Sequence, residues 1–142
     1  MTVARILEKK GYRVFSIAET APLGEIIGAL AAHKIGVLIV TDASGNGVGI
    51  VSERDVIRAL DESFEATRTA ADIMTRTLVR CSVDDTEGNL MEQMGKARVR
   101  HLPVQHNGKL VGVVSARDIL NLRIEKLNEL MQEILAEAAA RS

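Results

Sequence analysis

The stretch GIVSERDVIRAL, residues 49–60, returns later in the chain as GVVSARDILNL, residues 112–122. Three polar residues recur at matching positions of the two stretches: Ser52, Arg54 and Asp55 in the first, and Ser115, Arg117 and Asp118 in the second. The repetition indicates either a structural unit that is built twice or a binding site that is formed twice.

The repetition covers most of the chain. Residues 33–40 (HKIGVLIV) align with residues 97–104 (ARVRHLPV) at an offset of 64 residues. The offset falls to 63 after the turn at 41–49, because that turn is one residue longer than its counterpart at 105–112, and loops tolerate insertions. Each copy therefore predicts a short strand, a helix, two strands joined by a Gly/Asn-rich turn, and a second helix.

Local sequence patterns predict the helix and the hairpin of the first copy. In TAPLGEIIGALAAHKIG, residues 20–36, apolar residues recur on one helical face, Thr20 suits an N-cap, and Gly36 is expected to end the helix. The β-branched runs 37–40 and 48–51 flank a turn rich in Gly and Asn, which predicts a hairpin. One copy has too few elements to cover its sheet. We therefore expect two copies packed with pseudo-two-fold symmetry in an α/β (α+β) fold.

The chain divides into three predicted parts. Residues 1–68 form the first repeat with an N-terminal helix, residues 69–125 form the second repeat, and residues 126–142 form a C-terminal helical extension. The polar segment at 61–77 is a linker that holds a short helix near residues 70–74. The two repeats are expected to act as one module.

The C-terminal segment carries an apolar stripe. Its residues follow one another in steps of four and three, which is typical of the a/d seam between two helices. The stripe consists of Leu120, Ile124, Leu127, Met131, Ile134 and Ala138. A helix seated on its own domain and a contact between two copies of the chain both explain this pattern.

Composition narrows the function classes. The chain has 142 residues, 46% of them hydrophobic, which is enough for a proper core. A net charge of −1 and 2% aromatic residues argue against nucleic-acid binding. No apolar stretch approaches the roughly 18 residues of a membrane span, and the N-terminus is charged where a signal peptide is apolar. One cysteine, Cys81, excludes an intrachain disulfide. We expect a cytoplasmic protein without a metal site.

The repeated polar residues have two interpretations. Ser52 followed three residues later by Asp55 resembles a capping box, in which the two side chains satisfy free N–H groups at the start of a helix. The cap does not explain why Arg54 and the glycine before the serine also recur. A helix N-terminus attracts anions and a neighbouring arginine adds a charged fork, so two phosphate-binding pockets are the alternative.

The spaced motifs GIVSERD, DIMT, RHLPV and GVVSARD resemble the CBS domain, the cystathionine-β-synthase-type repeat, in its paired form called a Bateman module. The resemblance covers roughly residues 8–125. It implies two tandem repeats of the order β-α-β-β-α that bind adenosyl ligands in clefts between them. AMP, ADP, ATP or NAD(H) are the expected ligands, and S-adenosylmethionine is less favoured. No cofactor is required.

The resemblance also implies roles for single residues. Asp55 and Asp118 would hold ribose hydroxyls, because one ionised carboxylate can accept two hydrogen bonds. The adenine would lie beside Phe15 in one cleft and beside Val79 in the other, with Thr75 nearby. The basic pair before the proline of the second repeat, Arg100 and His101, would face phosphates. The first repeat has Gly36 and Val37 there, so the two clefts are expected to differ in charge.

Three functions are compatible with the sequence. The first is a regulatory module whose nucleotide or dinucleotide occupancy is read by an unknown partner protein. The second is a dimeric scaffold of the same fold without a bound nucleotide. The third, an enzyme, is disfavoured because no set of nucleophile, base and orienting group is visible. We expect a homodimer that binds neither nucleic acid nor membrane.

Overall fold

The computed structural model describes residues 2–62, 67–76 and 79–142. The chain forms two compact units: unit 1 comprises residues 1–12 and 79–142, and unit 2 comprises residues 13–78. Part of the predicted linker at 61–77 lies outside the described residues, as does Leu78 of the predicted second repeat.

Unit 2 is built on a three-stranded sheet in the order β1-β2-β3. β1 (Ser16–Ala18) pairs parallel with β2 (Val37–Thr41), and β2 pairs antiparallel with β3 (Gly47–Ser52), which confirms the predicted hairpin. Asp42 closes the turn, because its Oδ1 accepts from the backbone N–H groups of Ser44 and Asn46.

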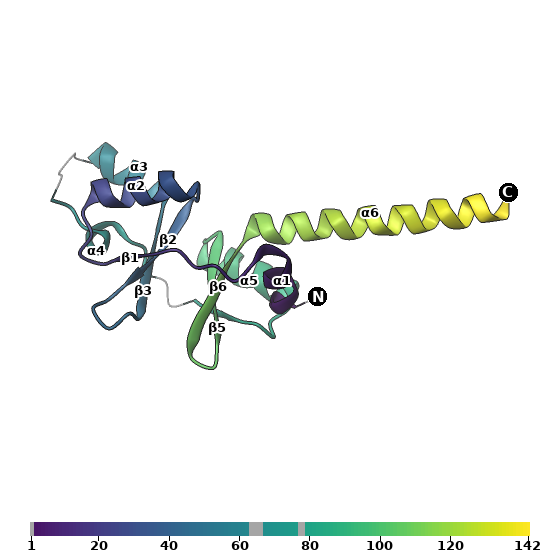
Figure 1. The fold of residues 1–142 in the computed structure, drawn as a ribbon, viewed down its shortest axis with the longest axis horizontal. Coiled ribbons are helices and arrows are strands. Elements are labelled where there is room, and N and C mark those ends of the chain that lie inside the picture. The colour runs from purple at the N-terminus through teal and green to yellow at the C-terminus, as the bar shows by residue number, and fades with distance from the viewer. Residues whose placement is uncertain (1, 63–66, 77–78) are drawn as a thin grey trace. The chain divides into compact units, whose positions relative to one another are not determined.

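The helices of unit 2 lie beside one another (Figure 1). They are α2 (Leu23–His33), α3 (Glu53–Glu62) and the short α4 (Ala70–Ile73). Two details of α2 differ from the prediction. Pro22, not Thr20, occupies the N-cap, and the helix ends at Lys34 in the left-handed conformation, before it reaches Gly36. The core of unit 2 consists of Ile17, Ala21, Leu23, Ile26, Leu30, Leu38, Val40, Val51, Val56 and Ala70.

Unit 1 repeats this arrangement with a second sheet in the order β4-β5-β6. β4 (Cys81–Ser82) pairs parallel with β5 (His101–His106), and β5 pairs antiparallel with β6 (Lys109–Ser115). The hairpin turns at Asn107 and Gly108, which both have positive φ as a type I′ turn requires. Both units therefore contain the predicted strand, helix, hairpin and helix, and the α+β fold is confirmed.

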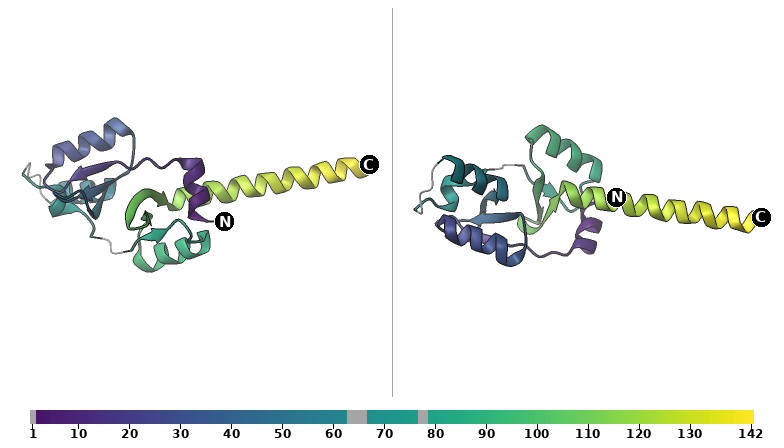
Figure 2. Two further views of the ribbon diagram at one scale, coloured as in Figure 1. Left: turned by 60° about the horizontal axis from the view of Figure 1, so that its bottom comes forward. Right: turned by 90° about the horizontal axis from the view of Figure 1, so that it is seen from above.

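Unit 1 contains three helices: α1 (Val3–Lys10), α5 (Glu87–Ala97) and α6 (Ala116–Arg141). The N-terminal helix α1, which the sequence analysis grouped with the first repeat, packs against the second sheet and the beginning of α6 (Figure 2). Val3, Ile6 and Leu7 are its buried residues. The core of unit 1 also includes Cys81, Leu90, Met94, Leu102, Val104, Val114, Ile119 and Leu122.

The last helix of the second repeat and the C-terminal extension form one continuous helix, α6, which has no break near residue 126. Its side chains are exposed from Arg123 to the end of the chain. Of the helices in the described part of the chain, none is long and apolar enough to cross a membrane.

Candidate functional site

Asp55 is buried at the first turn of α3, with 7% of its surface exposed. Its Oδ2 accepts hydrogen bonds from the Ser52 backbone N–H at 2.8 Å and from the Ser52 hydroxyl at 3.0 Å. The Asp55 backbone N–H in turn donates to Ser52 Oγ at 3.3 Å. The predicted capping box is therefore present, and it fixes the carboxylate at the start of the helix.

Two further groups meet the other oxygen of Asp55. The Thr75 hydroxyl donates to Oδ1 at 3.3 Å, and Arg58 Nη1 lies 3.7 Å from the same atom. The structure thus brings together Ser52, Asp55 and Thr75, three of the residues that the sequence pointed to. Arg58 was not among them, although its place three residues after Asp55 on a helix would have indicated it.

Gly49 explains how the chain after α4 reaches Asp55. Thr75 and Ile50 exchange two backbone hydrogen bonds, of 2.9 Å and 2.8 Å, directly beside Gly49. A Cβ atom on Gly49 would lie 2.7 Å from Met74 Sδ and 2.9 Å from the Thr75 carbonyl oxygen. The recurring glycine before the serine therefore allows a close backbone approach, as expected of glycine in a strand.

Asp118 occupies the equivalent place in unit 1, at the first turn of α6. Its Oδ2 accepts from the Ser115 backbone N–H at 2.8 Å, and its own N–H donates to Ser115 Oγ at 3.1 Å. The same Oδ2 lies 2.7 Å from Lys10 Nζ. Both contacts use one oxygen, so Oδ1 of Asp118 has no hydrogen-bond partner within the described ranges.

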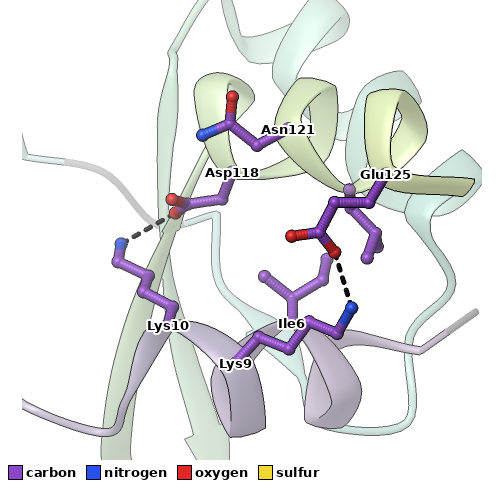
Figure 3. Close-up of a pocket in the computed structure, with 7 residues that line it drawn as sticks. Ile6, Lys9, Lys10, Asp118, Asn121 and Glu125 are labelled. Atoms are coloured by element: carbon purple, nitrogen blue, oxygen red, sulfur yellow. Dashed lines mark hydrogen bonds and ion pairs between the residues drawn. The ribbon is translucent and has the colours of Figure 1, made fainter. Parts of the chain in front are cut away.

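A pocket of about 190 Å³ opens beside Asp118, between α1 and α6 (Figure 3). Five of its seven lining residues have polar or charged side chains, and two ion pairs cross it: Lys10 with Asp118, and Lys9 with Glu125. It is lined by Ile6, Lys9, Lys10, Asp118, Asn121, Leu122 and Glu125. The candidate acid of the second repeat therefore lies at the edge of an open, charged cavity formed entirely by unit 1.

His101 is half-buried at the start of β5, opposite Ser115 in the sheet register. Burial, followed by the positive charge of Lys10, lowers the pKa of His101 below its usual 6.5, and the nearby Asp118 carboxylate partly opposes this shift. Arg100 adds a further positive charge that acts in the same direction as Lys10. His101 therefore lies near two cationic side chains, Lys10 and Arg100, and near the carboxylate of Asp118.

Lys10 was missed by sequence reasoning. The repeat offset of 64 residues aligns Thr75 with Gly11, and Lys10 directly precedes Gly11. Lys10 contacts the carboxylate of Asp118 as Thr75 contacts that of Asp55. Extending the alignment to the segment that precedes each first strand would have found it. Asp55 of the first repeat is contacted by the hydroxyl of Thr75, whereas Asp118 of the second repeat is contacted by the ammonium group of Lys10.

The remaining candidates are spread over the two units. Arg54 and Arg117 are exposed, and their side chains make no hydrogen bond or ion pair with any residue that the structure describes. Gly36 faces the carboxylate of Glu53, whose Cδ would be 3.8 Å from an added Cβ. A negatively charged side chain thus lies beside Gly36, whereas the equivalent position of the second repeat is Arg100.

Phe15 and Val79, the two expected neighbours of the adenine, both contact other residues of their own unit. The Phe15 ring lies 4.3 Å from the His33 ring, and the Arg13 guanidinium lies over it at 4.6 Å. Val79 is partly buried against the core of unit 1. Within the described ranges, no three His, Cys, Asp or Glu side chains lie close enough to hold a metal ion.

Comparison with known proteins identifies relatives of this chain. Two segments, residues 3–62 and 70–125, match the CBS domain. A CBS-domain containing protein from Agrobacterium tumefaciens has a similar crystal structure, with 38% sequence identity and a TM-score of 0.81, and the match covers 86% of this chain and 92% of that one.

Two other similar structures hold adenosine compounds. A CBS domain protein from Pyrobaculum aerophilum, complexed with AMP, shares 29% identity at a TM-score of 0.75 over 83% of this chain and 89% of that one. The CBS domain pair of protein MJ0100, in complex with 5′-methylthioadenosine and S-adenosyl-L-methionine, shares 26% identity at a TM-score of 0.78 over 89% and 98%.

Several curated relatives are longer than the matched region. The chain spans 22% of an inosine-5′-monophosphate dehydrogenase from Methanocaldococcus jannaschii, to which it is 32% identical over 111 residues. It spans 65% of an uncharacterized protein from Acidianus ambivalens. The repeat pair thus occurs both in short proteins and as one part of longer ones.

Proposed function

Because the chain belongs to the CBS-domain family, we propose that it is a regulatory, non-catalytic module that binds an adenosyl ligand through Asp55 and Asp118. AMP, ADP, ATP and NAD(H) are the proposed ligands, with S-adenosylmethionine less favoured. The AMP and S-adenosylmethionine complexes of similar CBS structures support the class of ligand.

The observation that carries this proposal is the way in which each carboxylate is held. One oxygen of Asp55 and one of Asp118 are fixed by the backbone N–H of the preceding serine. A fixed carboxylate needs no ordering when it accepts both hydroxyls of a ribose, so the entropic cost of binding is low. Oδ1 of Asp118 is available for this, whereas on Asp55 a ribose hydroxyl would replace the Thr75 hydroxyl at Oδ1.

The two acids lie in different electrostatic surroundings. Lys10 is paired with Asp118, and the charge of Arg100 acts on His101 beside them, so this half of the module is suited to ligands with phosphate groups. Near Asp55, Arg58 supplies one positive charge, but the Glu53 carboxylate faces Gly36, the position equivalent to Arg100, and opposes phosphate binding there. We propose that Asp118 serves a phosphorylated ligand such as AMP and that Asp55 favours a ligand with fewer negative charges.

Asp118 also supplies a route for regulation. Its carboxylate begins α6 and is paired with Lys10 of α1, so a ligand on Asp118 competes with or reinforces the contact between these helices. A ligand that binds more tightly when this contact is changed would meet the condition for a regulatory switch, which is a difference in affinity between two conformations. In this proposal the protein is a homodimer, and a partner protein binds its ligand-bound and ligand-free conformations with different affinity.

Calorimetric titration with AMP, ATP, NADH and S-adenosylmethionine tests this function. Asp118→Asn is expected to weaken AMP binding by about tenfold, because a charge-assisted hydrogen bond becomes a neutral one. The cap survives this change: Thr86 and Asn89 show in α5 that an asparagine makes the same box. Asp55→Asn is the parallel test for the first repeat.

Asp72→Asn is the matched control. Asp72 caps α4 through the Thr69 backbone N–H at 2.8 Å, the same bond that Asp55 and Asp118 make, but it is not a proposed ligand residue. Its substitution should leave ligand affinity unchanged. Folded protein that takes up none of the four compounds would refute the proposal and favour the alternative, a dimeric scaffold of the CBS fold.

A further inference from the structure

The outer face of α6 carries the apolar stripe that the sequence analysis identified. We call Leu120, Ile124, Leu127, Met131, Ile134 and Ala138 the α6 stripe. Its five large side chains are each between 46% and 61% exposed, and Leu130 and Leu135 beside them are 52% and 58% exposed. The stripe is therefore a continuous apolar surface in contact with water, which is unusual for a stable monomer.

Unit 1 contacts α6 from the opposite face. Ile119 and Leu122 are the buried residues of the helix. At 3.6 residues per turn, Leu120, Ile124, Leu127 and Met131 lie within about 40° of the direction opposite to Leu122. The core of unit 1 consequently cannot cover the stripe, and the stripe does not seat the helix on unit 1.

The second half of α6 also lacks lateral support. From Lys126 onward, no hydrogen bond or ion pair joins the helix to another element in the part of the chain that the structure describes, and Figure 1 shows this half extending away from unit 1. In proteins most of the stability of a helix comes from packing of its apolar face. A partner on the apolar side would supply this packing to the second half of α6.

We propose that α6 pairs antiparallel with α6 of a second copy of this chain. In the register that brings the stripe together, Leu120 faces Ala138 of the second copy, Ile124 faces Ile134, and Leu127 faces Met131. The pairing is self-complementary, so a two-fold axis relates the copies, as in most dimers. This inference rests on the proposed homodimer and does not depend on nucleotide binding.

Side-chain size and charge favour the antiparallel direction. In a parallel pair Ala138 would meet Ala138 and leave a gap, whereas the antiparallel register pairs this small residue with Leu120. The same register places Arg123 next to Glu137 of the second copy at both ends of the contact, in positions flanking the seam. A parallel pair would place Arg123 beside Asn128 instead. Arg123 also lies 3.7 Å from Glu87 of its own chain.

Cysteine substitution in the full chain tests the direction. Ile124→Cys and Ile134→Cys proteins are oxidised separately and as an equal mixture. The antiparallel register predicts cross-linked dimers only in the mixture, because equal residues lie about 15 Å apart along the axis. A parallel register predicts cross-links in each protein alone. The native Cys81 is buried and is common to all samples.

Light scattering separates the possible failures. A monomer at tens of micromolar would refute both the homodimer and the α6 pairing, whereas a dimer without the mixed cross-link would refute only the pairing.

Met131→Asp places a charge in the seam and should raise the dimer dissociation constant at least tenfold. Gln132→Asp, on the adjacent position outside the stripe, is the matched control and should leave the dimer intact. Equal effects of both variants would refute the proposed interface.

Discussion

The Lys10 ammonium lies 2.7 Å from Oδ2 of Asp118 and 2.7 Å from the carbonyl oxygen of Val113. One side chain of α1 thereby joins the end of β6 to the first turn of α6. The acid that begins α6 is at once a helix cap, one half of an ion pair and the proposed ribose ligand of the second repeat.

Lys10→Met should lower the free energy of unfolding by about 0.5–1 kcal/mol, because the ion pair is partly exposed and water screens it. Side-chain exposure is 37% for Lys10 and 18% for Asp118, against 45% and 53% for the pair of Lys9 with Glu125. Lys9→Met should therefore cost less. Urea denaturation of both variants provides the measurement, and a larger loss for Lys9→Met would contradict this ranking.

Gly49→Ala should destabilise the protein by roughly 1–3 kcal/mol and displace Thr75 from Asp55, because the new Cβ would overlap a backbone oxygen that cannot rotate away. Gly112→Ala should cost less, since its nearest neighbour is the end of the Leu7 side chain at 2.8 Å. Gly24→Ala is the control. That position lies in α2 with nothing within 4 Å, so alanine should stabilise the protein by about 0.4–1 kcal/mol. Thermal unfolding midpoints in the opposite order would contradict this account.

Stability should fall on acidification through the titration of His101. Burial and Lys10 hold the pKa of His101 below 6.5, so between 6.5 and the lowered value the unfolded chain binds more protons than the folded chain. The free energy of unfolding therefore decreases as pH falls through this window and levels off below it. His101→Gln should remove this component.

The same titration gives an independent check. Lys10→Met removes one of the charges that lower the pKa of His101, so it should narrow the pH window. Denaturant titrations between about pH 7.5 and pH 5 measure the slope. An unchanged slope in His101→Gln would show that other groups cause the acid sensitivity.

Cys81 should be unreactive in the folded protein. Burial, with a smaller contribution from Asp85, raises the pKa of its thiol to about 12, and only the thiolate reacts with disulfide reagents. Labelling near pH 8 should therefore occur at the rate of unfolding, and denaturant should accelerate it. Immediate stoichiometric labelling of folded protein would be incompatible with the buried position.

The repeat made most of the fold predictable. Local patterns of apolar residues, glycine and asparagine placed the hairpins, the helices and the two capping boxes, because these features depend on neighbours in the sequence. The end of α2 was less predictable, since Lys34 adopts a left-handed conformation that glycine usually occupies.

The contacts of the two acids were only partly predictable. Thr75 was expected near the adenine, and in the structure its hydroxyl donates to Asp55. Lys10 and Arg58 were not expected. The spacing of three residues between Asp55 and Arg58 on a helix indicates their pair, whereas Lys10 and Asp118 are 108 positions apart and meet only because α1 packs against α6.

The sequence alone determined that one unit is built twice and that Ser52 with Asp55, and Ser115 with Asp118, begin a helix in each copy, since caps form between residues three positions apart. Only the tertiary structure decided that α1 packs on the second sheet, that Lys10 pairs with Asp118, and that the α6 stripe faces water. Such contacts join residues far apart in the chain, and their free energy comes from burial and charge in the folded state, which no short stretch of sequence contains.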